Sequence, residues 1–188
     1  MANPGEAATS GAKRQVVPSR PVYPTPAALI TSVDPHGRPN IISLGEVFNI
    51  SIEEPVILGI AVRKARYSHE LISQTREYVV NLPRCAQAEA VWKCGAVSGR
   101  DTDKFALTGL TPVPATRVRP PLIAECPVNI ECRVIGIQEI GDHDLFLGEA
   151  LAQHVDESAL DPDGRIVPAR LDGFALVAGE FWSFGRKL

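Results

Sequence analysis

The run Ile57-Leu58-Gly59-Ile60-Ala61-Val62 passes without a break into Arg63-Lys64-Ala65-Arg66-Tyr67-Ser68-His69-Glu70-Leu71. The first part is apolar and β-branched, which predicts a buried strand. Three of the next four residues are cations, and Ser68, a residue type that caps helices, follows them. The spacing of the apolar residues after it indicates a short helix over 68–75. The sequence therefore predicts a strand, a basic turn and a helix in direct succession.

This junction is a candidate site for an anion. The first turn of a helix offers unpaired N–H groups and a partial positive charge. Arginine side chains beside it, such as Arg63 and Arg66, would complete a phosphate site. The alternative is a solvated basic turn that binds nothing, and the segment by itself leaves both interpretations open.

The composition is that of a globular protein with one folded domain. The chain has 188 residues, 45% of them hydrophobic and 22% charged, which is enough for a substantial core. Residues 1–20 are rich in Ala, Gly, Ser and Pro, so we expect a disordered or arm-like segment there and a single domain over 21–188. The net charge of −3 argues against a nucleic-acid partner. The basic cluster is local and suits one small anion.

The cysteines predict neither a disulfide framework nor a metal site. They form no Cys-x-x-Cys pair, and together with the four histidines they give no zinc spacing. We expect buried, reduced thiols at Cys85, Cys94, Cys126 and Cys132. The sequence shows no apolar signal core and no run long enough to span a bilayer. These features predict a cytoplasmic protein with no membrane partner.

The pattern of strands and turns favours a mainly β fold, an antiparallel β-barrel with a few inserted helices. Most of the expected strands are joined by short turns, which argues against a doubly wound α/β sheet. No Gly-x-Gly-x-x-Gly or Gly-x-x-x-x-Gly-Lys motif is present, so a nucleotide would bind in neither a Rossmann nor a P-loop manner. The expected strands are 27–33, 40–48, 56–62, 77–82, 128–134, 145–155 and 174–177, and the expected helices are 68–75, 85–94 and a short one around 104–107.

Polar residues recur where these strands end and in the loops between them. The chain has no Gly-x-Ser-x-Gly elbow and no evident catalytic triad. It has instead the parts to hold an anionic ligand whose own chemistry does the work. The polar candidates are Asn40, Ser43, Arg63, Arg66, Ser68, Asn81, Ser98, Arg100, Lys104 and His143.

Four segments resemble the flavin reductase-like, FMN-binding split-barrel family, and within it the flavoredoxin branch. The resemblance covers about Val22 to Gly185, and order and spacing match throughout. The segments are 23–31 with 37–43, Arg63 to Ile72 with Tyr78-Val-Val-Asn-Leu-Pro83, Cys94-Gly-Ala-Val-Ser-Gly-Arg-Asp-Thr-Asp-Lys-Phe105, and Gly141-Asp-His-Asp-Leu-Phe-Leu-Gly-Glu-Ala150.

The resemblance implies an antiparallel split barrel that forms a homodimer, with FMN in a groove near the subunit interface. The isoalloxazine ring would lie against the strand over 40–46, and an aromatic residue of the tail, Phe181 or Trp182, would cover it. His143 would reach the flavin and is the one candidate for a catalytic role. The other implied FMN contacts are Asn40, Ser43, Leu44, Gly45, Glu46, Arg63, Arg66, Ser68, Asn81, Ser98, Arg100 and Lys104.

The implied activity is that of an NAD(P)H-dependent flavin reductase. NADH or NADPH would reduce the bound FMN, and the electrons would pass to free flavin, to ferric chelates or to a partner protein such as a monooxygenase component. One alternative is a flavoredoxin-type electron carrier with no NAD(P)H activity of its own. Others are a non-enzymatic FMN-binding module and a split barrel that binds a different ligand.

Glu46 departs from the family pattern, because related flavoredoxins often carry an aromatic residue there, typically Trp. A carboxylate near the flavin would disfavour its anionic reduced form and lower its potential. The alternative is that Glu46 points to solvent.

Overall fold

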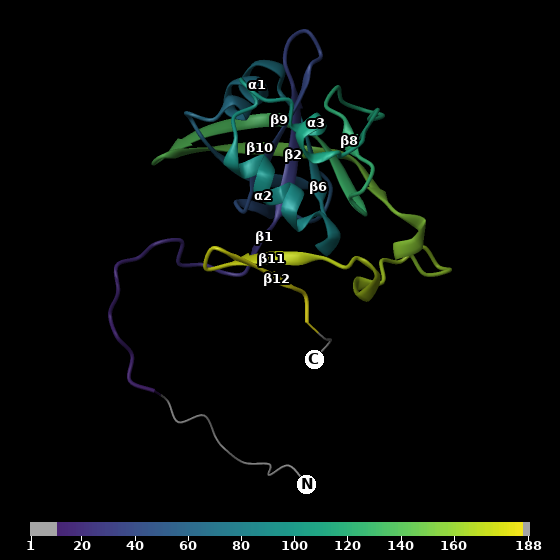
Figure 1. Ribbon diagram of the computed structural model, residues 1–188. Coiled ribbons are helices and arrows are strands. Elements are labelled where there is room, and N and C mark those ends of the chain that lie inside the picture. The colour runs from purple at the N-terminus through teal and green to yellow at the C-terminus, as the bar shows by residue number, and fades with distance from the viewer. Residues whose placement is uncertain (1–10, 186–188) are drawn as a thin grey trace.

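The computed structural model of the chain describes residues 11–185 (Figure 1). Strands hold 42% of the residues and helices 18%, which confirms the predicted mainly β class. Seven antiparallel strands form the main sheet in the order β3-β2-β6-β9-β10-β5-β4. They are β2 (Ala28–Val33), β3 (Pro39–Leu44), β4 (Val47–Ser51), β5 (Ile57–Arg63), β6 (Glu77–Leu82), β9 (Val128–Ile140) and β10 (His143–Val155).

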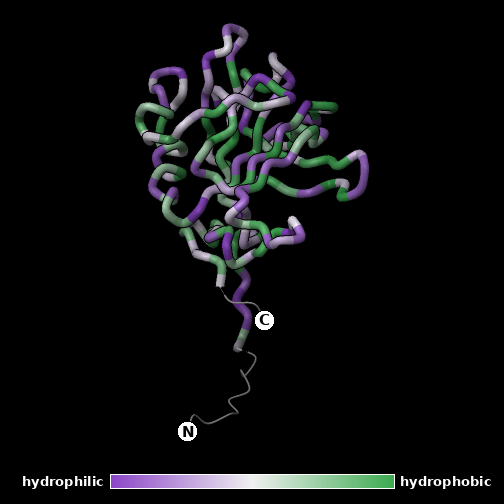
Figure 2. The backbone as a smooth tube through the Cα atoms, turned by 90° about the vertical axis from the view of Figure 1, so that its right-hand side faces the viewer, coloured by the Kyte–Doolittle hydropathy of each residue, from purple (hydrophilic) through white to green (hydrophobic). Residues whose placement is uncertain are grey.

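The main sheet curls around one apolar core. Side chains from all seven strands meet in it, with Ile60, Tyr78 and Phe146 among its fully buried members. Apolar residues alternate along the strands because successive side chains point to opposite faces. Figure 2 shows the hydrophobic segments gathered inside the body and the hydrophilic ones in the outer loops. The barrel predicted from the strand pattern is therefore built around this cluster.

The helices of the domain are α1 (Tyr67–Thr75), α2 (Ala88–Ala96) and α3 (Lys104–Thr108). Helix α1 adds Ile72 to the main core, whereas α2 and α3 cover the outer face of β2 and β3. A second apolar cluster joins Leu29 and Ile41 of the sheet to Val91 of α2 and Phe105 of α3. Strand β2 is consequently buried on both faces, and Figure 1 shows it behind α2 and α3.

Smaller elements complete the domain. A three-stranded sheet in the order β1-β11-β12 lies below α2 in Figure 1. The bounds are β1 (Thr25–Pro26), β7 (Pro112–Val113), β8 (Leu122–Ile123), β11 (Phe174–Val177), β12 (Glu180–Ser183) and the 3-10 turns Cys85–Gln87, Glu157–Ala159 and Pro168–Arg170.

The structure corrects several predicted element boundaries. The strand expected over 40–48 is divided at Gly45, where a side chain would come within 2.9 Å of Thr25 Oγ1, and β4 pairs with β5 instead. The strand expected over 128–134 continues to Ile140 as one arm of a long hairpin with β10. The segment 111–127, where no strand or helix was expected, contains β7 and β8.

The terminal arm is described in part. Residues 11–20 are exposed and contain no helix or strand, whereas residues 1–10, also predicted to be disordered or arm-like, lie outside the described residues. All four cysteines are free, and three of them are buried. Within residues 11–185 no helix is long and apolar enough to cross a membrane.

Candidate functional site

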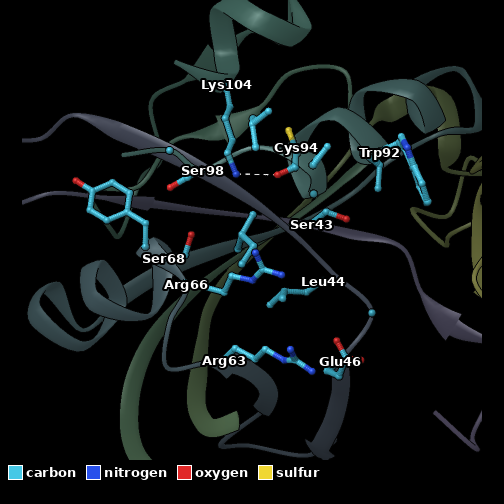
Figure 3. A pocket seen from close by; sticks show the side chains of 18 of the residues that line it. Ser43, Leu44, Glu46, Arg63, Arg66, Ser68, Trp92, Cys94, Ser98 and Lys104 are labelled. Carbon is cyan, nitrogen blue, oxygen red and sulfur yellow. Dashed lines mark hydrogen bonds between the residues drawn. The ribbon is translucent and has the colours of Figure 1, made fainter. Parts of the chain in front are cut away.

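A cavity of about 620 Å³ opens between β3, the turn before α1, the helix α2 and the start of β10 (Figure 3). It brings together most of the candidates chosen from the sequence, although they come from segments far apart in the chain. The predicted residues that line it are Asn40, Ser43, Leu44, Gly45, Glu46, Arg63, Arg66, Ser68, Ser98, Lys104, His143 and Phe181.

Lys104 supplies a buried cation at one end of this pocket. It begins α3, which Asp103 caps by accepting hydrogen bonds from Phe105 N and Ala106 N. The Lys104 ammonium donates to the Cys94 carbonyl oxygen over 2.7 Å (Figure 3). Burial lowers the pKa of Lys104. An ammonium has three donors, so an anion in the pocket could accept the remaining hydrogen bonds.

The start of α1 faces Lys104 at the same end of the pocket. The sequence favoured Ser68 as the cap, but the structure places Arg66 at the N-cap position and begins the helix at Tyr67. Ser68 is buried instead, and its hydroxyl accepts a hydrogen bond from the Asn40 amide over 2.7 Å. The helix N-terminus, the Ser68 hydroxyl and the Arg66 guanidinium thus face the same cavity as Lys104, a combination suited to a phosphate.

His143 and Arg63 lie together at the opposite end. They form a direct cross-strand pair between β10 and β5. Asp142 joins them, with Oδ1 2.7 Å from His143 Nδ1 and Oδ2 3.0 Å from Arg63 Nη2. The hydrogen bond with His143 lowers the pKa of Asp142. Asp142 thereby orients the imidazole at the edge of the pocket.

Glu46 also lines the pocket, and its carboxylate pairs with Arg20 over 3.2 Å. Arg20 belongs to the segment expected to be an arm, and no sequence signal marked it as a pocket residue. Its guanidinium partly offsets the charge of Glu46.

Aromatic side chains form one wall. Phe181 lines the pocket and meets Trp92 edge to face, with ring centroids 5.9 Å apart. Trp182 is 58% exposed and is not among the lining residues, so Phe181 is the tail residue at the wall within one chain. Trp92 was not predicted as a site residue; its position in an Ala-rich helix was the only available signal.

Two further candidates, Asn81 and Arg100, do not line the pocket. Asn81 is fully buried in β6, where its amide oxygen accepts from Ile123 N and Asn129 Nδ2. Arg100 is exposed, pairs with Glu70 over 2.7 Å and lies 4.9 Å from the Tyr67 ring. Asn81 therefore satisfies core hydrogen bonds, the Arg100 guanidinium lies over the Tyr67 ring, and their expected contact with FMN stays a prediction.

Comparisons with known proteins agree with this architecture. The family described as flavin reductase like domain matches residues 19–170. An uncharacterized protein of Archaeoglobus fulgidus is 39% identical over 77% of this chain and 78% of its own. The flavoredoxin of Desulfovibrio vulgaris (Miyazaki F) superposes with a TM-score of 0.87 at 30% identity, covering 94% of this chain and 96% of its own.

A split-barrel protein of Shewanella frigidimarina has a TM-score of 0.79 at 25% identity, covering 87% of this chain and 83% of its own. These findings confirm the predicted split barrel. The chain belongs to the flavin reductase like domain family.

Proposed function

We propose that this protein is an FMN-binding flavoprotein oxidoreductase that acts as an NAD(P)H-dependent flavin reductase. The observation that carries the proposal is the two-ended polarity of the pocket. Lys104, Arg66 and Ser68 gather at one end, Leu44, Trp92 and Phe181 supply apolar wall, and Arg63, His143 and Glu46 lie toward the other end. FMN has the matching shape, with a dianionic phosphate at one end and a flat apolar ring at the other.

The size and chemistry of the pocket support this fit. A cavity of about 620 Å³ falls in the range of small-molecule and cofactor sites. Arg66, Ser68 and Lys104 would hold the phosphate, and the backbone of 43–45 would contact the polar edge of the ring. Bound FMN would supply the electron transfer itself.

His143 would act at the edge of the flavin. Its Nδ1 is engaged by Asp142, which leaves Nε2 for a ligand. It would orient the nicotinamide of NADH or NADPH, and its catalytic contribution would be positional and electrostatic. The electrons would pass to free flavin, ferric chelates or a partner protein such as a monooxygenase component.

A second candidate is an electron carrier without NAD(P)H activity. The similarity to the Desulfovibrio flavoredoxin over nearly the whole chain favours it. Both candidates require the same FMN site.

An anaerobic absorbance experiment separates them. The purified protein is mixed with FMN, freed of excess, and recorded before and after addition of NADH and then NADPH. Flavin bands that bleach support the reductase and identify the donor. Bands that persist with both donors but bleach with dithionite support the carrier. Protein without flavin bands and without measurable FMN affinity overturns both.

We also propose a homodimer, because an apolar face of the barrel continues into the pocket. Phe48 and Ile50 of β4 are 45% and 47% exposed and pack over Gly59 of β5. Phe48 and Leu147 are both direct cross-strand partners of Gly59, so all three face the side opposite the core. This exposed apolar face is suited to a second copy.

The same face leads to the site. Arg63 lies four residues beyond Gly59 on β5 and so points to the same side, next to His143. A second copy on the apolar face would therefore form part of the pocket wall. Sedimentation velocity tests this: Phe48→Ser should shift a dimer toward monomer, and Leu107→Ser, an exposed apolar change on α3, should not. A monomeric wild-type protein would overturn the proposal.

A further inference from the structure

We propose that His69 and Asp144 are positioning residues for the phosphate end of the pocket, and that they raise the affinity for FMN without touching it. The inference rests on the proposed function. Their contact links the first turn of α1 to the beginning of β10, two elements that each contribute a neighbouring residue to the pocket wall.

The contact is short and enclosed. His69 Nε2 lies 2.8 Å from Asp144 Oδ2, across 75 residues of sequence, with the two side chains 17% and 7% exposed. The imidazole also meets the Phe146 ring edge to face, with centroids 5.2 Å apart. Such packing fixes the rotamers of both side chains.

The position of this contact connects it to the site. His69 follows Ser68, and Asp144 follows His143, and both of these neighbours line the pocket. Successive side chains of a strand point to opposite faces, so Asp144 points away from the side that His143 faces. The first turn of α1 is thus held twice, by the Asn40 amide on the Ser68 hydroxyl and by Asp144 on His69.

Asp144 depends on these partners. Its Oδ1 is buried and has no hydrogen-bond partner within the described part of the chain, although Lys64 Nζ lies 3.4 Å away and also contacts Glu139 at 2.7 Å. Burial opposes ionisation, but the His69 hydrogen bond and the charge of Lys64 outweigh it, so the pKa of Asp144 is lowered. Loss of His69 would leave a buried carboxylate with less compensation, and the strand and helix would shift to relieve it.

Comparing FMN with riboflavin tests the proposal, because the two ligands differ only in the phosphate. Dissociation constants for both are measured by quenching of flavin fluorescence with the wild-type protein, Asp144→Ala and His69→Ala. We expect both variants to weaken FMN binding about tenfold and to leave riboflavin binding within about twofold of wild type.

The conservative variant Asp144→Asn separates positioning from charge. Its amide oxygen can still accept from His69, so positioning predicts FMN affinity near or above that of the wild type. A purely electrostatic role of Asp144 predicts instead that Ala and Asn both tighten FMN binding, because each removes a negative charge near the phosphate. The matched control is His154→Ala, which breaks a His–carboxylate contact of 2.6 Å at the other end of β10.

Each outcome decides a different point. A wild-type protein that binds FMN no better than riboflavin refutes the phosphate end of the proposed function, and with it this inference. A wild-type preference for FMN that Asp144→Ala and His69→Ala both leave unchanged overturns the positioning role alone. Equal losses for both ligands also overturn it, since they indicate general damage to the fold.

Discussion

Each end of β10 takes part in one contact between a histidine and a buried carboxylate, but the two carboxylates differ in how fully they are hydrogen-bonded. At the far end, His154 Nε2 lies 2.6 Å from Glu131 Oε1. At the pocket end, His69 Nε2 lies 2.8 Å from Asp144 Oδ2. The Glu131 carboxylate has a partner on both oxygens, whereas Asp144 Oδ1 has no hydrogen-bond partner among the described residues.

At the far end, the Glu131 carboxylate is fully hydrogen-bonded and joins two parts of the fold. Besides His154, Glu131 accepts hydrogen bonds from Thr116 N and Oγ1, Arg117 N and Val118 N. These bonds fasten the Pro-rich segment before β8 to the barrel. At the pocket end, Asp144 and Lys104 are charged groups that can each form a further hydrogen bond. From this difference we infer that buried charge stabilises the fold at the far end, whereas at the pocket end Lys104 keeps donors for a ligand and Asp144 positions its neighbours.

Among the tests of this comparison, Glu131→Gln has the largest expected effect. The substitution removes a fully buried charge and replaces one acceptor oxygen with an NH2 group, so the N–H groups that this oxygen accepted from lose their partner. Breaking such a network typically costs about 3–5 kcal/mol, so we expect a loss of that size in the free energy of unfolding, measured with urea. The ratio of FMN to riboflavin affinity should stay at its wild-type value. A loss below about 1 kcal/mol would contradict the structural role.

Acid should weaken the same hydrogen-bonded network around Glu131. Burial raises the pKa of Glu131, but hydrogen bonds from Thr116, His154 and Arg117 outweigh it and hold the pKa at about 2, against an ordinary value of 4.5. A carboxyl with a depressed pKa stabilises the fold above its unfolded value and loses that contribution as pH falls toward the folded one. Its share is about 3 kcal/mol, lost between pH about 4.5 and about 2.

The measurement is urea unfolding of wild type and Glu131→Gln at both ends of that pH range. The stability gap between the two proteins should narrow by most of that amount as pH falls. A gap that stays constant through the range would show that the Glu131 charge does not carry the effect.

Lys104→Met tests the pocket end and should have the opposite sign for stability. Burial lowers the pKa of Lys104, which means that the folded protein without ligand holds this charge at a cost. We expect the ligand-free variant to be at least as stable as the wild type in urea. We expect FMN affinity to fall by about 2 kcal/mol, roughly 30-fold, through loss of a charged hydrogen bond.

The control is Lys93→Met, which removes an α2 lysine paired with Glu89 and outside the pocket; both quantities should stay at wild-type values. If Lys104→Met destabilised the protein as much as Glu131→Gln, the distinction between the two ends would fail.

Much of the pocket end could be predicted from the sequence because its defining parts are neighbours in the chain. Arg63, Arg66 and Ser68 lie in one strand–turn–helix junction, and local patterning places such a junction well. Trp92 and Arg20 reach the pocket only through tertiary packing, which no local pattern encodes.

The far end was missed for a related reason. A glutamate on an alternating strand, such as Glu131, normally indicates a solvated face, and only the Pro-rich segment folded over it makes it a buried anchor. Asn81 shows the same ambiguity, because an asparagine on a strand looks the same in sequence whether it faces a ligand or, as here, bonds to core groups.

The smallest predicted effect concerns Glu46, whose charge at the pocket is partly offset by Arg20. A carboxylate near the flavin disfavours the additional negative charge of the reduced cofactor, so Glu46→Gln should raise the reduction potential of bound FMN. Arg20 pairs with Glu46 at 3.2 Å, and both side chains reach solvent, so the rise should be modest, on the order of 30 mV or less.

Arg20→Gln should lower the potential, because it exposes the flavin to an uncompensated Glu46 charge, and the double variant should return toward the value of Glu46→Gln. Potentiometry of the FMN-loaded proteins measures all three. Glu149→Gln is the matched control, since this β10 carboxylate pairs with Arg133 away from the pocket. Absence of a rise in Glu46→Gln would mean that the carboxylate does not act on the flavin. Arg20 would then neutralise the Glu46 charge completely, and Lys104 and Asp144 would be the groups that distinguish the pocket end from the far end.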